Sequence, residues 1–530
     1  MQFVLLGRVA TMDAASTVLA NGAVYVDGNT IVAAADRSAP PPAGFAGATT
    51  VDTAGVIFPG LIELHNHLSY DALELWRVPQ KFSNRSQWQG NADYVANVSS
   101  PMTTIASSRD ARLLAAVARY AETKCLFGGV ASSQGISLKG DNMLTSYRSA
   151  MRVVDDPGDR QFPRARTCIP DVSASDWAKF KNELDKASCM LLHLSEGLDA
   201  KARDAFLALQ NGSQWAINSA LAGIHCAALQ PQDFAVMQEN GASVVWSPLS
   251  NLLLYGGTTD IKAARSAGLA IALGSDWSPS GSKNLLNELK VAKVADDVLG
   301  IGLADQDIVA MVTSTAARIV KWDGLVGSIA AGKRADFTVI AAPAAADPYA
   351  SIINARETDL VLLMIDGQAV LGTAPLMSAL GQSGETIPLG GTTRVVNYGS
   401  GDPRLPMLSF EEARAAMADA LSRLPTLLED ERAGRGVCGH SLVASSGPQL
   451  RLALNEEHLG GLALRPCLPF HGSPTGPDAA LHAAAAPTPP LKAVPLDPPT
   501  VTDDPNYAAA LQAQANIPAA IKAGLQSFYG

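Results

Sequence analysis

The sequence predicts an α/β protein, namely a (β/α)8 TIM barrel with a small flanking β-sandwich domain and a C-terminal extension. Short apolar runs alternate with helical stretches from Val56 to Trp322, a span of about 265 residues that is close to the size of such a barrel. Short strands separated by turns precede and follow this span. Histidines stand at the ends of several apolar runs, where a barrel of this kind carries its active site.

The chain begins with runs of apolar and β-branched residues that predict three strands: Phe3–Val9, Ala23–Val26 and Thr30–Ala34. The residues between the last two runs are Asp27, Gly28 and Asn29, which are typical of a tight hairpin turn. We therefore expect an antiparallel β structure before the barrel.

Six apolar runs of the alternating part are interpreted as barrel strands: Val56–Leu64, Cys125–Ser132, Cys189–Leu194, Ala222–His225, Ala242–Ser247 and Ala270–Gly274. Helical apolar periodicity is present at Ala111–Ala121 and Ile261–Ala267. Strands that alternate with helices favour βαβ units and a parallel sheet.

Strands return after Gly324, at Asp336–Ile340 and Leu360–Ile365, and are expected to join the N-terminal strands in one small β domain. Farther along, Phe410–Leu428 predicts an amphipathic helix, residues 464–505 are rich in Pro and Ala, and a last helix is expected at Tyr507–Phe528. The expected domains are residues 1–57 and 324–372 as the two parts of the β-sandwich, residues 58–323 as the barrel, and residues 373–530 as the extension.

The composition excludes several classes of partner. The net charge is −10 and the pI is near 5.3, which argues against nucleic acid or an anionic membrane surface as the main partner. No segment approaches the roughly 18–20 uninterrupted apolar residues of a membrane span. Six scattered cysteines without a C-x-x-C pair are expected to be reduced, and a cytoplasmic location is the expectation.

The eight histidines are unevenly distributed, with four of them in the first 371 residues at or near the ends of predicted strands. His65 and His67 follow the first barrel run and flank Asn66, and residues i and i+2 of a strand point to the same face, so both imidazoles can bind one ion. His193 and His225 end two later runs, and Asp276 follows the last.

Three imidazoles and a carboxylate suit one divalent ion, Zn²⁺ or alternatively Fe²⁺, with one position open for water. Each of these residues taken singly has an ordinary interpretation, because a lone strand histidine is more often structural and Asp276 alone could cap a loop. The interpretation as a metal site depends on their joint placement at successive strand ends.

Four segments resemble the amidohydrolase superfamily: Pro59–His67, His193–Glu196, Ser247–Leu252 and Leu273–Asp276. The resemblance covers roughly residues 1–372 and is strongest to the group that holds guanine and cytosine deaminases and triazine hydrolases such as atrazine chlorohydrolase. It implies a site for a single metal ion with His65, His67, His193 and Asp276 as ligands. It also implies that Glu196 is the proton shuttle and that His225 polarises the substrate or adds a ligand. Lys139 as the carboxylated bridging lysine of a two-metal member is the alternative, although it follows the second strand and that lysine belongs to the fourth.

Two departures from that group fall where substrate would bind. Trp246 ends the predicted seventh strand, where a His or Cys is usual, and the loop from Asp71 to Pro101 carries Arg85, Trp88 and further aromatic and basic residues. We expect Trp246, Arg85, Trp88 and Asn251 to contact substrate, with the indole stacking on a flat group and the arginine binding an acidic group. The alternative is that Trp88 and the arginines only pack the loop onto the barrel rim.

The machinery predicts attack of activated water on a trigonal carbon. We expect hydrolysis of a carbon–nitrogen bond that is not a peptide bond, as in deamination of a small heterocyclic or aromatic compound, by a homo-oligomeric enzyme. Hydrolysis of an amide or small peptide is the alternative, because the motifs are shared. A barrel that has lost catalysis and serves as a metal-binding or assembly protein is the alternative of another class, but it would be expected to lose Glu196 or Asp276 first.

Overall fold

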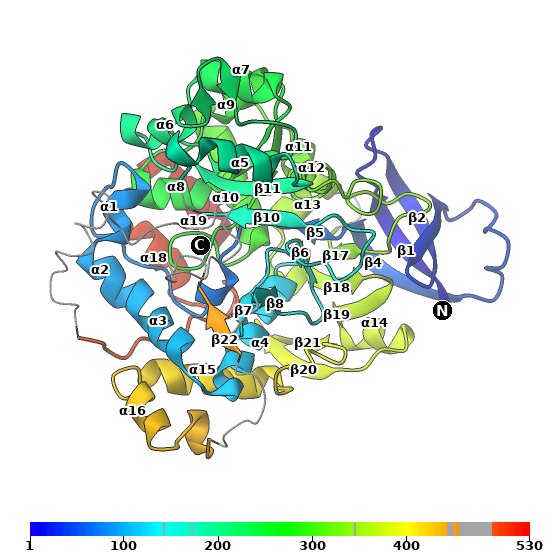
Figure 1. Ribbon diagram of the computed structural model, residues 1–530. Coiled ribbons are helices and arrows are strands. Elements are labelled where there is room, and N and C mark those ends of the chain that lie inside the picture. Colours follow the sequence, from blue (N-terminus) through cyan, green and yellow to red (C-terminus); the bar gives the residue numbers. More distant parts are fainter. Residues whose placement is uncertain are drawn as a thin grey trace.

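The computed structural model describes residues 1–140, 144–169, 171–172, 174–343, 346–442, 450–454 and 490–529 (Figure 1). Its central part is a five-stranded parallel sheet in the order β10-β11-β14-β15-β16. The bounds of these strands are Ala165–Cys168, Cys189–Leu194, Leu221–His225, Ser243–Trp246 and Ala270–Leu273. The α/β class predicted from the sequence is confirmed by these parallel strands and the helices between them.

A second parallel sheet has the order β5-β6-β9, with bounds Leu61–Ile62, Val130–Ser133 and Arg152–Val153. Hydrogen bonds join its two edges to the five-stranded sheet. On the β9 side Ala165 N donates to Val154 O at 3.0 Å. On the β5 side Asp276 N donates to His65 O at 3.0 Å and His67 N donates to Asp276 O at 2.6 Å. The segments that follow β5 and β16 are therefore held side by side.

A nine-stranded sheet contains the N-terminal strands together with strands that follow residue 336, in the order β20-β21-β19-β18-β17-β4-β1-β2-β3. The strand bounds are Gln2–Ala10 for β1, Val18–Asp27 for β2, Thr30–Asp36 for β3, Thr49–Pro59 for β4, Phe337–Ala341 for β17, Leu360–Ile365 for β18, Gln368–Gly372 for β19, Glu385–Leu389 for β20 and Thr392–Val396 for β21. The segments before and after the parallel strands thus meet in one sheet, which extends from the lower centre (β20 and β21) to the right (β1 and β2) of Figure 1.

Two expected strands are shorter than the apolar runs that predicted them. The run Val56–Leu64 divides at Gly60 into the end of β4 and the start of β5, which belong to different sheets. The expectation that Cys125–Ser132 is a strand is wrong at its start, because helix α4 (Ala111–Phe127) continues to Phe127. Gly128 and Gly129 then end the helix, and Gly129 takes the positive φ of 72° that a glycine tolerates.

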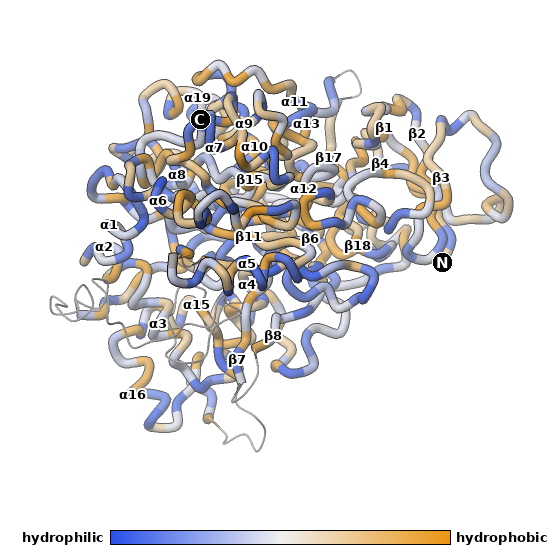
Figure 2. Tube along the Cα trace, turned by 45° about the horizontal axis from the view of Figure 1, so that its top comes forward, coloured by the Kyte–Doolittle hydropathy of each residue, from blue (hydrophilic) through white to orange (hydrophobic). Residues whose placement is uncertain are grey.

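Helices pack around the strands, and hydropathic colouring shows apolar residues concentrated along interior strands such as β11 and β15 (Figure 2). The longer ones are α4, α5 (Trp177–Leu184), α6 (Ala200–Leu207), α7 (Pro231–Glu239), α8 (Pro248–Tyr255) and α10 (Leu285–Leu299). Helix α15 (Phe410–Ser422) begins with a capping box, in which Ser409 accepts from Glu412 N and Glu412 accepts from Ser409 N, and it packs on α4. It ends at Ser422, before the expected Leu428, and α16 (Leu427–Arg432) follows.

The last expected helix is in fact two helices, α18 (Tyr507–Gln512) and α19 (Ala519–Tyr529), separated at Pro518. Helix α19 packs on α10. Most of the Pro- and Ala-rich segment falls outside the described residues. Among the described helices, none is both long and apolar enough to cross a membrane. Cys125, Cys189, Cys226 and Cys438 are free thiols, whereas Cys168 is disulfide-bonded, so the expectation of reduced thiols is wrong at Cys168.

Gly274 follows β16 at the point where the chain passes closest to His65. A Cβ at this position would lie 2.4 Å from His65 Cβ and 2.7 Å from both His65 N and His65 O. We therefore expect Gly274→Ala to destabilise the fold by about 1–3 kcal/mol, because backbone cannot yield as a side chain does.

Thermal unfolding of the metal-free protein measures this effect, with Gly324→Ala as the matched control. No atom lies within 4 Å of a Cβ at Gly324, so that variant should stay within about 0.5 kcal/mol of wild type. Equal stabilities of the two variants would contradict the close approach.

Candidate functional site

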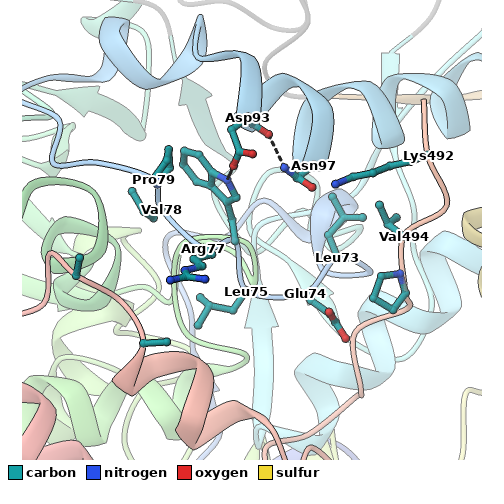
Figure 3. Close-up of a pocket in the computed structure, with 14 residues that line it drawn as sticks. Leu73, Glu74, Leu75, Arg77, Val78, Pro79, Asp93, Asn97, Lys492 and Val494 are labelled. Carbon is teal, nitrogen blue, oxygen red and sulfur yellow. Dashed lines mark hydrogen bonds between the residues drawn. The ribbon is translucent and has the colours of Figure 1, made fainter. Parts of the chain in front are cut away.

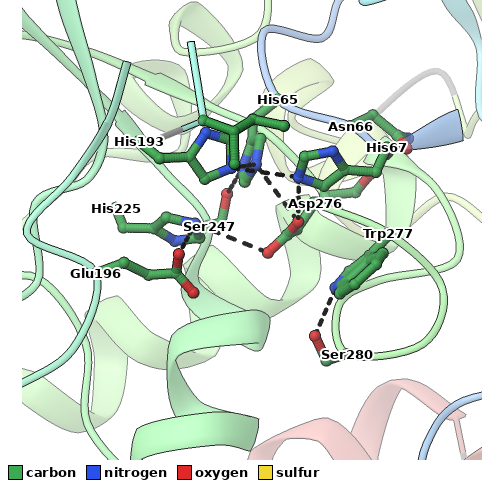
Figure 4. A network of polar contacts seen from close by, with 12 residues as sticks. His65, Asn66, His67, His193, Glu196, His225, Ser247, Asp276, Trp277 and Ser280 are labelled. Atoms are coloured by element: carbon green, nitrogen blue, oxygen red, sulfur yellow. Dashed lines mark hydrogen bonds and ion pairs between the residues drawn. The ribbon is translucent and has the colours of Figure 1, made fainter. Parts of the chain in front are cut away.

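Three imidazoles and one carboxylate converge at the ends of the parallel strands (Figure 4). His65 Nε2 lies 3.1 Å from His193 Nε2, and His67 Nε2 lies 3.3 Å from the same nitrogen. Asp276 Oδ1 lies 3.4 Å from His65 Nε2 and 3.5 Å from His67 Nε2. All four side chains are buried. The four atoms therefore face one small volume from different strands.

These distances fit a tetrahedral metal site. Zinc bound to nitrogen and oxygen at about 2.0–2.1 Å requires ligand atoms about 3.3–3.4 Å apart, which is within a few tenths of an ångström of the four distances here. Nitrogen lone pairs at such separations repel one another unless a proton or a metal ion lies between them. The residues present therefore fit a divalent ion such as zinc.

The protonation state of the histidines supports the same conclusion. Burial and the neighbouring imidazoles lower the pKa of His65 and of His193 well below the ordinary histidine value, and burial lowers the pKa of His67 to about 3. These rings are therefore neutral at neutral pH, which is the form that binds metal.

Polar groups behind the ligands fix their orientation. His65 Nδ1 lies 2.7 Å from Ser247 Oγ, so its Nε2 points toward the other ligands. The Glu63 carboxylate, buried two residues before His65, accepts hydrogen bonds from Ser275 and from Asn66 Nδ2. Because Asn66 lies between the two histidines and Ser275 precedes Asp276, one carboxylate links both ligand segments.

The backbone at this site takes conformations that are uncommon for residues other than glycine. Ser195, His225, Cys226 and Asp276 all have positive φ, at 52°, 65°, 53° and 69°. Each lies at the end of a strand, and two of them, His225 and Asp276, line the cavity. Such conformations persist only when the surrounding structure imposes them, and they cluster at functional sites.

Glu196 follows His193 by three residues, and its carboxylate is held at both oxygens. Tyr255 donates to Glu196 Oε1 at 2.8 Å, and Arg85 Nη1 lies 3.7 Å from Glu196 Oε2. Burial raises the pKa of Tyr255 well above the ordinary phenol value, so the hydroxyl remains protonated and donates. The same hydroxyl accepts from Trp88 Nε1 at 2.8 Å. The loop residue Trp88 is thereby connected to Glu196 through one hydroxyl.

His225 stands opposite Glu196, with its Nε2 3.8 Å from Glu196 Oε2 and 3.9 Å from Asp276 Oδ2. Its Nδ1 lies 3.0 Å from Asn251 Oδ1. The amide of Asn251 donates through Nδ2 to the hydroxyls of Thr258 and Thr259, which identifies Oδ1 as the acceptor for His225. The proton of the neutral ring is thus on Nδ1, and Nε2 is an acceptor. Burial lowers the pKa of His225, which favours that neutral form.

The four expected substrate contacts divide into two pairs. Arg85 and Trp88 line the cavity at the site, together with His67, Gln89, Ile169, His193, Glu196, His225, Asp276 and Trp277. Asn251 instead orients His225 from behind. Trp246 is fully buried in the core with its Nε1 donating to Thr258 Oγ1 at 2.7 Å, and the next residue, Ser247, reaches the site.

Trp277 was not among the residues singled out from the sequence, although it directly follows Asp276. Its ring centre lies 5.3 Å from that of His67, and its Nε1 donates to Ser280 Oγ at 2.6 Å. Position next to a predicted ligand was the available signal. Lys139, the alternative bridging lysine, lies on β7 (Ser137–Lys139) and is not among the lining residues. His440, one of the four later histidines, bonds Val437 O in the C-terminal extension.

The cavity between these walls has a volume of about 10 Å³, room for about one water molecule. Arg85 and Trp88 form one wall, and Trp277 with His67, His193, His225 and Asp276 forms the others. The cavity in this structure is therefore small. The wall formed by Arg85 and Trp88 comes from the loop that carries Arg85 and not from a strand end.

Comparisons with known proteins agree with this geometry. Residues 56–370 match the amidohydrolase family. The 5-methylthioadenosine/S-adenosylhomocysteine deaminase of Symbiobacterium thermophilum is 27% identical over 420 residues, which are 69% of this chain and 92% of that protein. The guanine deaminase of Escherichia coli is 26% identical over 149 residues, covering 28% of this chain and 33% of that protein.

Solved structures show the same fold. A zinc-bound adenosine deaminase from Xanthomonas campestris has a TM-score of 0.53 at 18% identity and covers 72% of this chain and 97% of that one. Atrazine chlorohydrolase from Arthrobacter aurescens TC1 complexed with zinc has a TM-score of 0.54 at 17% identity and covers 71% of this chain and 100% of that one. Both likenesses leave more than a quarter of this chain unmatched.

The contacts of Tyr255 predict that its hydroxyl supports turnover without supporting metal binding. Tyr255→Phe removes the donor to Glu196 and leaves Trp88 Nε1 without its acceptor. We expect kcat to fall about tenfold while zinc content stays unchanged, since a misplaced general acid–base group loses part of a contribution of about 10²–10⁴.

Tyr147→Phe is the matched control, because it removes another buried hydroxyl that lies 3.3 Å from a carboxylate, Glu122, remote from the site. Equal turnover in the two variants would show that the Tyr255 hydroxyl does not act through Glu196.

Proposed function

This chain belongs to the amidohydrolase family, and we propose that it is a metal-dependent hydrolase that deaminates a small heterocyclic compound. The observation that carries the proposal is the set of three imidazole nitrogens and one carboxylate at tetrahedral separations, with Glu196 and His225 beside them. The deaminase relatives favour carbon–nitrogen bonds other than peptide bonds as the bonds that are hydrolysed.

One divalent ion, Zn²⁺ in preference to Fe²⁺, would be held by His65, His67, His193 and Asp276, where it would lower the pKa of bound water to about 7 and polarise the substrate. Asp276 has Oδ1 among the metal-binding nitrogens and Oδ2 toward His225, so it is placed to orient the water and take its proton. Glu196 faces the same space and is placed to pass that proton to the leaving nitrogen.

The tautomer of His225 limits its role. The neutral ring accepts a hydrogen bond at Nε2, from water or from an amino group of the substrate. Only the protonated ring can stabilise negative charge on the substrate, and a proton from Glu196 Oε2, 3.8 Å away, would produce it. His225 is therefore proposed as a partner of Glu196 in moving the proton, with Asn251 as its orienting residue.

The walls of the cavity favour a flat substrate. Trp88 and Trp277 present indole rings on which a heterocycle can stack. Arg85 Nη2 lies 3.0 Å from Asp171 Oδ1, and its other terminal nitrogen donates to Ile169 O at 2.8 Å. An acidic group on the substrate would have to compete with Asp171 and Glu196 for this guanidinium. We therefore propose an uncharged aminated heterocycle as the first substrate class to test.

We also propose that the eight parallel strands form a closed (β/α)8 barrel with a flanking β-sandwich. Hydrogen bonds at both edges of the two parallel sheets support closure. The boundaries proposed are residues 58–323 for the barrel, 1–57 and 324–372 for the sandwich, and 373–530 for the extension, whose first strands, β20 and β21, continue the sheet of the sandwich. A homo-oligomeric state stays a prediction from the sequence.

Hydrolysis of an amide is the second candidate, because a metal, Asp276 and Glu196 act on a carbonyl carbon in the same way. A non-catalytic protein on the same scaffold is disfavoured, since the proton-transferring residues are buried together with the metal-binding ones. Release of an amine from amides without ammonia from heterocycles would favour the amide hydrolase.

One metal ion per chain is the expected stoichiometry, because the two described groups that could hold a metal, one of His65, His193 and His225 and one of His65, His67 and Asp276, share His65 and surround one volume, and Lys139 lies outside the cavity lining. Elemental analysis of the purified protein should give about one equivalent of zinc or iron. Two equivalents, together with a carboxylated Lys139 by mass spectrometry, would contradict the site proposed here.

Ammonia release from a panel of aminated purines, pyrimidines and triazines tests the reaction. Glu196→Gln should lower turnover by about 10²–10⁴ while zinc content is retained, because the residue moves a proton and does not bind the metal. Glu239→Gln, a helix-end glutamate outside the cavity lining, is the matched control. Full activity in Glu196→Gln would remove this residue from the mechanism.

A further inference from the structure

The C-terminal segment of residues 490–529 packs against the loop from Asp71 to Pro101, which carries Arg85 and Trp88. This C-terminal segment lies beyond the family match, which ends at residue 370. Gln514 accepts from Val78 N at 3.2 Å and donates to Trp76 O at 3.1 Å. Asn516 Nδ2 donates to Gln80 O at 3.0 Å and to Leu253 O at 2.8 Å. Figure 3 shows a pocket of about 580 Å³ where the two segments face each other, with Lys492 and Val494 opposite the loop.

Asp497 is the most buried charged residue of this end segment, with 1% of its surface exposed. Its carboxylate bonds Lys124 Nζ at 2.6 Å through Oδ2 and Lys283 Nζ through Oδ1. Its backbone is fixed as well, because Asp497 N donates to Ala72 O at 3.0 Å and Tyr120 donates to Asp497 O. A carboxylate this deeply buried requires such cationic partners.

Lys124 connects Asp497 with the segments next to the proposed metal ligands. Its ammonium donates to Asp71 O at 2.6 Å and to Ser278 Oγ at 2.7 Å, so all three of its protons are used. Ser278 N in turn donates to Asp71 Oδ1 at 2.8 Å. Asp71 follows His67 by four residues and Ser278 follows Asp276 by two. Lys124 therefore ties together, from behind, the segments that carry two of the proposed metal ligands and Trp277.

We infer that the C-terminal segment completes the active site, with Asp497 as a positioning residue that holds Asp276 and Trp277 in register with His67 through Lys124. The inference rests on the proposed metal site for its zinc readout and on the proposed deamination for its kinetic readout. Outer partners of metal ligands typically contribute about 10–100-fold in metal affinity or activity, which sets the expected effect of removing this one.

Asp497→Asn in the full-length protein tests the inference, because it keeps the shape and removes the charge. We expect the zinc affinity, measured by competition with a chelator, to weaken by about 10-fold or more, and kcat to fall by a similar factor. Asp504→Asn is the matched control, since Asp504 bonds Lys283 at 2.9 Å, whereas the three protons of Lys124 go to Asp71, Ser278 and Asp497. That variant should retain zinc affinity and kcat within about twofold.

A folded Asp497→Asn variant with wild-type zinc affinity and kcat would overturn the inference, and so would an equal loss of zinc affinity in Asp504→Asn. If Asp497→Asn has no cooperative unfolding transition, Ser278→Ala removes the link between Lys124 and the Asp276 segment, and unchanged zinc affinity there overturns the inference as well. Absence of deamination by the wild type would sink the proposed function alone, because the zinc comparison needs no substrate.

Discussion

The confinement of several buried imidazoles and carboxylates to one small volume is the constraint on which the rest of this structure depends. The Nε2 atoms of His65 and His67 lie within 3.3 Å of His193 Nε2, and Asp276 Oδ1 lies within 3.5 Å of the first two. Without a cation, burial removes the hydration of these groups and their lone pairs repel one another. The rest of the fold must offset this unfavourable free energy. Ser247 and Glu63 fix the ring and loop orientations, and Gly274 allows two strand ends to approach closely. The other residues of these strands are packed in apolar core, and the free energy of that packing offsets the burial of the polar cluster.

The α/β class and the residues that gather at the strand ends could be predicted from the sequence because both leave local signals. A parallel strand is a short apolar run, and a polar residue at its end is visible one strand at a time. The direction of a side chain at a strand end is less local, since a shift of one residue reverses the face. Trp246 and Ser247 show this: the indole was expected at the site, whereas it is the serine that reaches His65. Likewise the helical continuation of α4 into Cys125–Phe127 cannot be separated from an apolar strand by hydropathy.

The acid–base residues depend on contacts between segments that are distant along the chain. Glu196 was visible from its motif, but the Tyr255 hydroxyl that holds it lies 59 residues later in the chain, and Trp88, which donates to that hydroxyl, lies 167 residues before Tyr255. No pattern in the sequence connects these residues, because each reaches the site from a different loop or helix. Arg85 lines the cavity, as its place in the loop suggested, and its role as a substrate contact stays a prediction, whereas its carboxylate partners, Asp171 and Glu196, are set by tertiary packing. The chemistry that a residue can perform could be inferred from its type. The residue that forms its hydrogen bond or ion pair could not be inferred from the sequence.

The end segment that carries Asp497 also depends on contacts between residues that are distant along the chain. Buried ion pairs contribute little net stability, because desolvation of both charges offsets their attraction, and their removal one partner at a time is costly. Asp497, with Lys124 and Lys283 around it, therefore serves orientation more than stability. Lys124 is separated from Asp497 by 373 residues, so this part of the site forms only after the barrel span and the end segment have met. A folding unit limited to the family-matched residues would leave Lys124 and Lys283 buried without this carboxylate. The extension is thus part of the structure that positions the proposed metal ligands, and its sequence, weak in motifs, is constrained by buried charge.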